Sequence, residues 1–276
     1  MGKSPKNPSE EGKRRDRERV MVGGLGIDAI ELGPLAELIV SDALNGQGKW
    51  VVTANLDHLR RCRDGSGYTE LMLAADYIVA DGRPLLWAAR LSGNRLPGLV
   101  AGSDLTPVLA VEASEQGARV LLVGGAPGAA LGAREALLKL APNLDLADVH
   151  IPPMGFEDDP VELAALEVAV ANSKADLVLV ALGSPLQERC IERLRVHLPG
   201  ASWVGVGISL SYLSGDVSRA PVWMRRVGLE WCYRLACEPR RLFRRYMMQC
   251  LPFGIMLLME SILLRWSDRR QEGLAS

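Results

Sequence analysis

Residues 175–182 (ADLVLVAL) predict a fully buried β-strand, because the run is apolar apart from Asp176. The strand leads into a loop, GSPLQE, and then into a helix that reaches His197. Similar apolar runs alternate with segments of helical periodicity along residues 49–54, 77–80, 119–125, 144–150 and 201–206. This alternation predicts an α/β fold, with a mostly parallel, Rossmann-like sheet covered by helices on both faces.

Composition is that of a soluble domain with a sizeable core: 276 residues, 48% hydrophobic and 24% charged. The five cysteines are scattered and form no CxxC pair, which favours a reducing compartment over a disulfide framework. Residues 1–19 are rich in charged residues and lack an apolar segment, so we expect a disordered tail and no secretory signal.

Asp81 is the first candidate for chemistry. It follows the apolar run at residues 77–80 and precedes Gly82, so it is expected at the carboxyl end of a strand, where α/β proteins gather their functional groups. A carboxylate there can accept a proton from an attacking hydroxyl. An Asp-Gly turn without any chemistry is the alternative.

Polar residues also follow the strand at residues 49–54. Thr53 and Asn55 lie where this strand gives way to a loop and a helix, so they are candidates for the same site. Helix capping by Asn55 or Asp57 explains them equally well. Farther along, Ser103 or Asp104 is expected to cap the helix that continues through residue 115.

Two further strand ends carry glycine turns. Gly124 and Gly125 precede a helix, and such a turn is suited to phosphate because free N–H groups and the helix dipole point there. Gly183 ends the next strand, and Gln187 and Glu188 fall in the first turn of the helix behind it. We expect these residues near one edge of the sheet.

The only acidic cluster is Glu157, Asp158 and Asp159. Closely spaced carboxylates can hold Mg²⁺. Because Pro160 and a helix follow directly, acidic residues of a helix start explain the cluster better, and no metal site is expected.

The C-terminal part has a different character. Residues 219–246 hold eight arginines against two glutamates and no lysine, with aromatic residues interleaved. Arginine grips phosphate oxygens in pairs, so we expect phosphate or anionic lipid there rather than only a solvated basic face. Arg234, Arg241 and Arg244 share one face if the helix is continuous, although Pro239 predicts a break.

Residues 247–264 are the most apolar stretch of the chain, and they follow the basic segment directly. The stretch contains Gln249, Pro252, Gly254 and Glu260 and is slightly short for a spanning helix. We interpret it as a helix that lies on or partly dips into a bilayer, with a true span as the alternative. The expected organisation is therefore an α/β core over residues 20–218 and a helical, membrane-binding appendage over residues 219–276.

These segments together resemble the WecG/TagA/CpsF glycosyltransferases over residues 20–246. The ordered motifs that carry the resemblance are TAN (53–55), ADYIVADG (75–82, with its preceding Ala74), LPGLVAGSDL (96–105), LLVGG (121–125), LGSPLQE (182–188) and RAP…LEW…EPRR…RRY (219–246). The resemblance implies an inverting enzyme that needs no metal or other cofactor. It would transfer a sugar from a UDP-sugar to a sugar on an undecaprenyl diphosphate, as a peripheral protein at the cytoplasmic membrane face.

The resemblance also implies roles for single residues. Asp81 is similar to the family's general base, with Thr53 beside it at the reacting centre. The residues implied to bind substrate are Asn55, Gly102, Asp104, Gly124, Gly125, Gly183, Gln187, Glu188, Arg219, Arg234, Arg241 and Arg244. The family's Pro-Lys-Gln-Glu is Pro-Leu-Gln-Glu here, with Leu186, and residues 207–212 (GISLSY) also depart from its pattern, which leaves the donor sugar open.

Three other interpretations are considered. A nucleotide-dependent oxidoreductase is disfavoured, because residues 20–27 (VMVGGLGI) lack the third glycine of a dinucleotide fingerprint. A membrane-attached nucleotide-binding protein without transferase activity is the non-enzymatic alternative. Nucleic acid is not the expected partner, because the basic segment continues into an apolar one. Homo-oligomers are compatible with the sequence.

Overall fold

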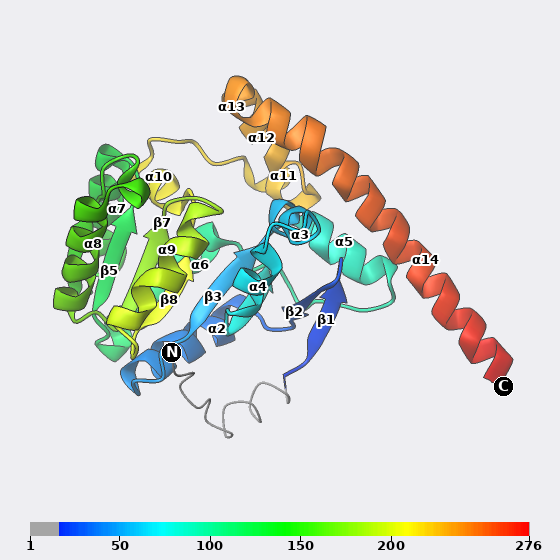
Figure 1. Ribbon diagram of the computed structural model, residues 1–276, viewed down its shortest axis with the longest axis horizontal. Coiled ribbons are helices and arrows are strands. Elements are labelled where there is room, and N and C mark those ends of the chain that lie inside the picture. The colour runs from blue at the N-terminus through cyan, green and yellow to red at the C-terminus, as the bar shows by residue number, and fades with distance from the viewer. Residues whose placement is uncertain (1–16, 276) are drawn as a thin grey trace.

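The computed structural model describes residues 17–275, apart from the side chains of residues 268, 269 and 271–275. A six-stranded sheet lies at its centre, with the strand order β4-β3-β8-β7-β5-β6 (Figure 1). All five strand pairs are parallel, which confirms the predicted α/β fold. The strands are β3 (Trp50–Ala54), β4 (Tyr77–Ala80), β5 (Val120–Gly124), β6 (Leu146–His150), β7 (Leu177–Ala181) and β8 (Ser202–Gly205).

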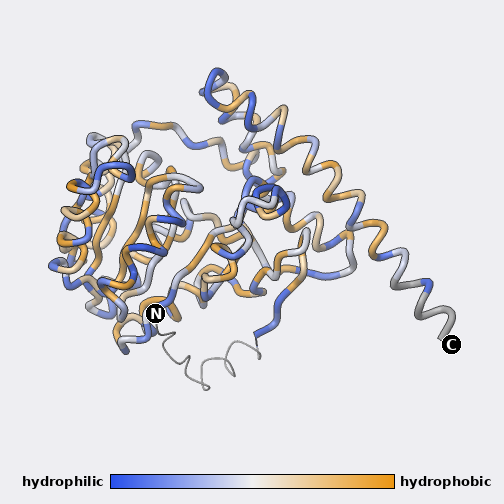
Figure 2. Tube along the Cα trace, in the orientation of Figure 1, coloured by the Kyte–Doolittle hydropathy of each residue, from blue (hydrophilic) through white to orange (hydrophobic). Residues whose placement is uncertain are grey.

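The sheet is apolar on both faces, as its orange strands in Figure 2 show. Alternate residues of each strand enter two separate hydrophobic clusters: Val52 and Val180 pack on one side, and Val51 and Leu179 on the other. A strand buried on both faces needs a continuous apolar run, which is the pattern of residues 175–182. Each such side chain contributes about 1.5–3 kcal/mol through its burial.

Helices cover both faces. The first face carries α3 (Leu56–Cys62), α4 (Tyr68–Leu73), α5 (Arg83–Leu91), α8 (Pro160–Ser173) and α9 (Leu186–Leu194). The second carries α2 (Leu32–Leu44), α6 (Gly102–Gln116), α7 (Pro127–Leu140) and the short α10 (Ser209–Ser214). Because α3 and α10 follow the neighbouring strands β3 and β8 toward opposite faces, the carboxyl ends of these two strands form a topological switch point, the place where α/β proteins bind ligands.

Residues 20–27 form a hairpin outside the central sheet. Strands β1 (Arg19–Val22) and β2 (Leu25–Asp28) pair antiparallel, and the turn uses positive φ at Gly23 and Gly24. The two glycines that interrupt this apolar run therefore reverse the chain direction. Arg19 belongs to β1, so the predicted tail at residues 1–19 ends earlier, and its residues 1–16 lie outside the described part.

The C-terminal part is a chain of helices that leaves the core and returns along its side (Figure 1). It comprises α11 (Val222–Val227), α12 (Glu230–Cys237), α13 (Pro239–Phe243), the π-helix η3 (Arg244–Cys250) and α14 (Leu251–Ala275). The predicted break at Pro239 is confirmed, since α12 ends before it and α13 begins with it. Helix α14 packs against α5 and α3 of the core.

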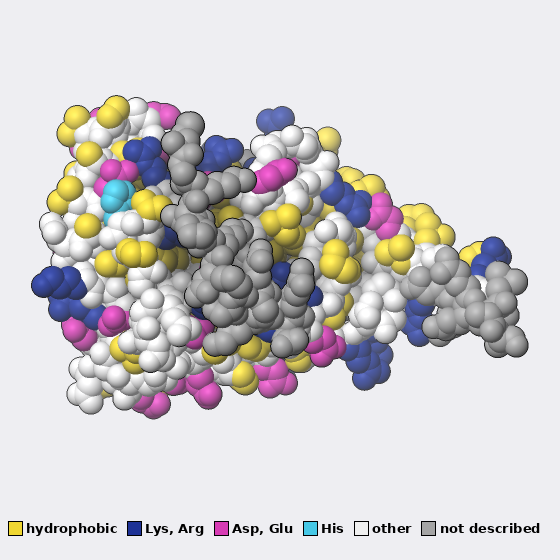
Figure 3. Space-filling view, turned by 60° about the horizontal axis from the view of Figure 1, so that its bottom comes forward, with side chains coloured by type: hydrophobic (Ala, Val, Ile, Leu, Met, Phe, Trp, Pro, Cys, Tyr) yellow, Lys and Arg dark blue, Asp and Glu magenta, His cyan; other side chains and the backbone are white. Residues whose placement is uncertain are grey.

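Helix α14 has two different faces. Phe253, Leu257 and Ser261 are buried, and the first two belong to the hydrophobic cluster of the core. Ile255 and Met259 lie on the outer face, which is exposed, and hydrophobic side chains gather along this projecting helix (Figure 3). Within the described residues, Pro239–Ser267 is one helical stretch long and apolar enough to cross a membrane by length and composition, and 28% of its most apolar window is buried in the protein.

Candidate active site

Asp81 and Thr53 meet at the carboxyl ends of β4 and β3. The Asp81 backbone N–H donates to the Ala54 carbonyl over 2.7 Å, which places the carboxylate next to the strand end that carries Asn55. Thr53 is 6% exposed, and its hydroxyl donates to the carbonyl of Gly205 on β8 over 3.3 Å. The structure therefore brings the two predicted catalytic residues together at the carboxyl ends of β4 and β3, beside the β3–β8 switch point.

Burial and the surrounding charged groups together set the pKa of Asp81. Part of the residue stays accessible, but burial of its carboxyl raises the pKa to about 7, and the charge of Glu230 on α12 adds to this rise. His58 and Arg234 oppose the rise, whereas Asp104 adds to it. A carboxylate with a pKa near neutrality is suited to accept a proton from an alcohol.

Asn55 begins α3 as its N-cap. Its side-chain oxygen accepts the backbone N–H groups of Asp57 and His58 over 3.0 and 3.4 Å, so the helix-capping interpretation of Asn55 is confirmed. His58 completes the capping box, because its Nδ1 accepts the Asn55 N–H over 3.2 Å. This hydrogen bond assigns the ring proton of His58 to Nε2.

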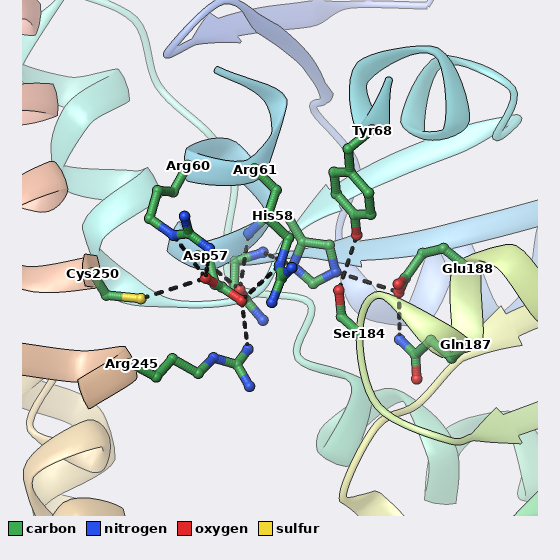
Figure 4. Close-up of polar contacts among 11 residues, drawn as sticks. Asp57, His58, Arg60, Arg61, Tyr68, Ser184, Gln187, Glu188, Arg245 and Cys250 are labelled. Atoms are coloured by element: carbon green, nitrogen blue, oxygen red, sulfur yellow. Dashed lines mark hydrogen bonds and ion pairs between the residues drawn. The ribbon is translucent and has the colours of Figure 1, made fainter. Parts of the chain in front are cut away.

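A buried pair lies directly behind this cap. His58 Nε2 is 3.4 Å from Glu188 Oε1, and the two side chains are 3% and 1% exposed (Figure 4). Burial alone would raise the pKa of Glu188, but hydrogen bonds from His58 and Gln187 outweigh it and hold that pKa below its usual value. The pair joins the first turn of α3 to the first turn of α9.

Gln187 extends the same network. Its Nε2 donates to Glu188 Oε1 over 2.7 Å, and its Oε1 accepts the backbone N–H of Gly207 over 3.1 Å. A Cβ on Gly205 would lie 2.7 Å from Nε2, so only glycine leaves room for this amide. Gln187 is 5% exposed, and its contacts fix the backbone after β8.

The predicted glycine turns form the neighbouring part of the edge. Gly124 and Gly125 have φ of +90° and +82°, and a Cβ on Gly124 would lie 2.8 Å from the Ala181 carbonyl oxygen. The Gly125 N–H donates to that same oxygen over 2.8 Å. Gly183, with φ of +74°, has open space where a side chain would be. The chain after β5 therefore lies so close to the end of β7 that Gly124 has no room for a side chain.

Gly102 and Asp104 open α6 beside Thr53. A Cβ on Gly102 would lie 3.3 Å from the backbone of Val206 and 3.4 Å from the Thr53 hydroxyl. The expected capping by Ser103 or Asp104 is wrong, because Ala101 is the N-cap and makes no side-chain hydrogen bond. The Asp104 carboxylate instead accepts two hydrogen bonds from Arg219, over 2.6 and 2.9 Å.

The three appendage arginines of the resemblance have different surroundings. Arg234 on α12 is close enough to Asp81 to influence its pKa, and its Nε is buried without a hydrogen bond. Arg241 pairs with Glu238 over 2.6 Å on the appendage, and Arg244 is exposed at the start of η3. Arg219 also lies 3.6 Å from Glu230, so Arg219, Glu230 and Arg234 connect the appendage to the site.

No group of three or more His, Cys, Asp and Glu side chains that could hold a metal ion is found in the described part of the chain. Asp159 of the acidic cluster caps α8, since its side chain accepts the N–H groups of Val161 and Glu162 over 2.9 and 3.4 Å. The assignment to the start of this helix is confirmed for Asp159, whereas Glu157 and Asp158 lie in the short 3-10 helix η1 (Phe156–Asp158) before it.

Comparison with known proteins follows the same lines. The profile of the glycosyl transferase WecG/TagA/CpsF family matches residues 20–267. The chain belongs to this family. Its match therefore covers both the sheet and most of the appendage, and the expected resemblance is confirmed.

Two relatives share one name, N-acetylglucosaminyldiphosphoundecaprenol N-acetyl-beta-D-mannosaminyltransferase. The protein of Bacillus subtilis (strain 168) is 35% identical over 177 residues, which are 63% of this chain and 66% of that protein. The protein of Bacillus spizizenii (strain ATCC 23059 / NRRL B-14472 / W23) is 34% identical over 195 residues, or 71% and 74% of the two chains. The matched part thus spans about two thirds to three quarters of these relatives.

For this WecG/TagA/CpsF family member, sequence reasoning missed His58 and Glu230. His58 stands three residues after Asn55, the capping-box position, and that spacing could have identified it. Glu230 carries no such signal, because only the return of the appendage brings it near Asp81. The roles of all these residues in catalysis and binding remain predictions.

Proposed function

We propose that this protein is an inverting, metal-independent glycosyltransferase of cell-surface polysaccharide synthesis. Its donor would be a UDP-sugar, of the N-acetylmannosamine type or a related hexose, and its acceptor a sugar linked to undecaprenyl diphosphate. The names of the two Bacillus relatives support this acceptor class and this kind of sugar. The observation that carries the proposal is the position of Asp81 at the end of β4. Its carboxyl has a pKa of about 7, and it lies next to the strand that carries Thr53 and within electrostatic range of Arg234.

In the proposed reaction, the acceptor hydroxyl gives its proton to Asp81 as its oxygen attacks the anomeric carbon. The bond from that carbon to the diphosphate oxygen breaks on the opposite face, so the configuration inverts. UDP leaves with one additional negative charge on its terminal phosphate, and Arg234, with Arg241 and Arg244, would supply positive charge. Because the Gly125 N–H is bonded to Ala181, the uncapped N–H groups at the starts of α7 and α9, behind the glycine turns, would hold the nucleotide.

The appendage supports a place at the membrane. Its arginines precede a helix whose outer face is apolar and exposed, and interfacial helices have this arrangement. Because the inner face of α14 is packed on the core, we propose a peripheral protein rather than a spanning one, at the cytoplasmic face where nucleotide sugars are available.

The test is transfer by the reconstituted protein from a panel of UDP-sugars to a short-chain prenyl-diphosphate acceptor. We expect Asp81→Asn to fold and bind UDP but to lose transfer by at least about a hundredfold, the usual contribution of a general base. Asp158→Asn, at an exposed aspartate far from the site, is the matched control. Unchanged turnover in Asp81→Asn would rule out the base, and UDP binding without any transfer in the wild type would favour the non-enzymatic alternative.

A further inference from the structure

A cluster of arginines surrounds one buried carboxylate where the core meets the appendage. Asp57, on α3, is 3% exposed (Figure 4). Arg60 and Arg61 of the same helix donate to its two oxygens, each over 3.0 Å. Arg245 of η3 reaches the same carboxylate over 3.0 Å. Three guanidinium groups thus converge on one negative charge.

The charges in this cluster do not balance. Burial alone would raise the pKa of Asp57, but Arg245 and Arg61 lower it below its usual value, so the carboxylate is ionised at neutral pH. The exposed Asp64 also lies within electrostatic range of Arg60 and Arg61, so three arginines face two carboxylates and leave a surplus of one positive charge. Arg63, one turn farther along, shows the contrast: it forms a two-bond pair with Glu260 over 2.9 and 2.6 Å, one charge against one.

The surplus charge is available to a ligand. The side chains of Arg60, Arg61 and Arg245 are 21%, 25% and 34% exposed, so each keeps part of its surface accessible. The Nε of Arg245 makes no hydrogen bond and is buried. Asp57 therefore fixes three forks in position without using all of their donors, which is a preorganised arrangement for phosphate oxygens.

The cluster lies between the sheet edge and the apolar helix. Helix α3 begins at Asn55, next to Asp81, and Arg60 and Arg61 follow five and six residues later, about 8–9 Å along the axis. On its other side, Arg245 is followed by the exposed side chains of Met248, Leu251 and Ile255. A lipid-linked sugar must place its diphosphate in this order, between the reacting sugar and the apolar tail.

We propose that Arg60, Arg61 and Arg245, organised by Asp57, bind the diphosphate of the lipid-linked acceptor. The assignment rests on the proposed function and separates two anion sites. Arg234, near Asp81, serves the departing nucleotide, and the Asp57 cluster serves the acceptor. Because Arg245 comes from the appendage and the other two arginines from the core, the acceptor site is complete only when η3 is docked on α3.

The experiment compares the wild type with Arg60→Gln/Arg61→Gln and with Arg245→Gln. Calorimetry measures the binding of geranyl diphosphate, inorganic diphosphate and UDP, and transfer is measured with acceptors linked through diphosphate, monophosphate or a neutral ether. We expect each variant to bind geranyl diphosphate about tenfold more weakly and to lose the preference for the diphosphate acceptor, with UDP affinity unchanged. Arg134→Gln, at an exposed arginine of α7, is the control.

Four outcomes would overturn the assignment: geranyl diphosphate binding that the variants leave intact, an equal loss of UDP affinity, an equal loss of transfer to all acceptors, or tighter binding of inorganic diphosphate than of the lipid form. The single Arg245→Gln variant covers the case in which the double variant fails to fold. If the wild type transfers no sugar but binds geranyl diphosphate through these arginines, the proposed function fails while the binding site stands.

Discussion

Asp81 shows how one residue is tuned by a distant part of the chain. Its carboxyl has a raised pKa first because it is buried and next because Glu230 of the appendage adds negative charge nearby. Because the two residues are 149 positions apart, this proximity cannot be read from the sequence. Neither His58 nor Arg234 offsets the two raising effects.

This tuning predicts the pH dependence of transfer. A general base acts in its ionised form, and with a pKa of about 7 Asp81 is mostly protonated at pH 6 and mostly ionised at pH 8. We therefore expect the transfer rate at saturating substrates to rise between pH 6 and pH 8 and then to level off. A pH–rate profile with a short-chain acceptor measures this.

Glu230→Gln provides the matched variant. Removing its negative charge lowers the pKa of Asp81, so the midpoint of the profile should move to lower pH. A midpoint that stays in place, or one that moves upward, would contradict the electrostatic role of Glu230.

At the scale of elements, α14 is a helix with two apolar faces, one buried on the core and one exposed. Leu257 on the inner face is 1% exposed and packs in the core cluster, whereas Ile255 and Met259 on the outer face are 54% and 60% exposed. Hydropathy alone could not separate the faces, because residues 247–264 are apolar nearly all round.

The two faces predict opposite effects of substitution. Ile255→Glu/Met259→Glu should abolish co-sedimentation with anionic vesicles and leave the urea midpoint unchanged, because those side chains contact no core residue of the buried cluster. Leu257→Ala should instead destabilise the protein by about 2–5 kcal/mol, since it leaves a cavity in the core, and should keep vesicle binding. Vesicle binding by the double glutamate variant would show that another surface meets the membrane.

At the scale of the whole molecule, the appendage is tied to the core at three places. Arg219 pairs with Asp104, Arg245 with Asp57 and Glu260 with Arg63. Between these pairs, Phe253 and Leu257 enter the hydrophobic cluster of the sheet. The predicted boundary at residue 218 therefore separates two parts that share a core.

Truncation after Val222 tests this coupling. We expect the truncated protein to keep its sheet, because the two clusters consist mainly of residues before 222, and to lose transfer to a lipid acceptor. Its thermal midpoint should fall by several degrees, because the truncation removes Phe253 and Leu257, and the burial of each side chain is worth about 1.5–3 kcal/mol. Circular dichroism and the transfer assay give the two measurements. Full activity of the truncated protein on a lipid-linked acceptor would contradict the proposal.

The sequence by itself determined the sheet and the place of Asp81. Apolar runs of four to eight residues that alternate with helical segments indicate buried strands, and a polar residue after such a run lies at the strand end. The same reasoning located Thr53, Asn55 and the glycine turns. The local pattern did not predict the hairpin at residues 20–27, because hydropathy does not show where a chain reverses direction.

Only the tertiary structure decided which charges meet. The His58–Glu188, Arg219–Asp104 and Arg245–Asp57 pairs join residues more than a hundred positions apart. No local propensity encodes such pairs, because each depends on how the sheet stacks its strand ends and on where the appendage returns. The ion pairs between appendage and core, with the burial of Phe253 and Leu257, hold the basic segment of the sequence beside the candidate site.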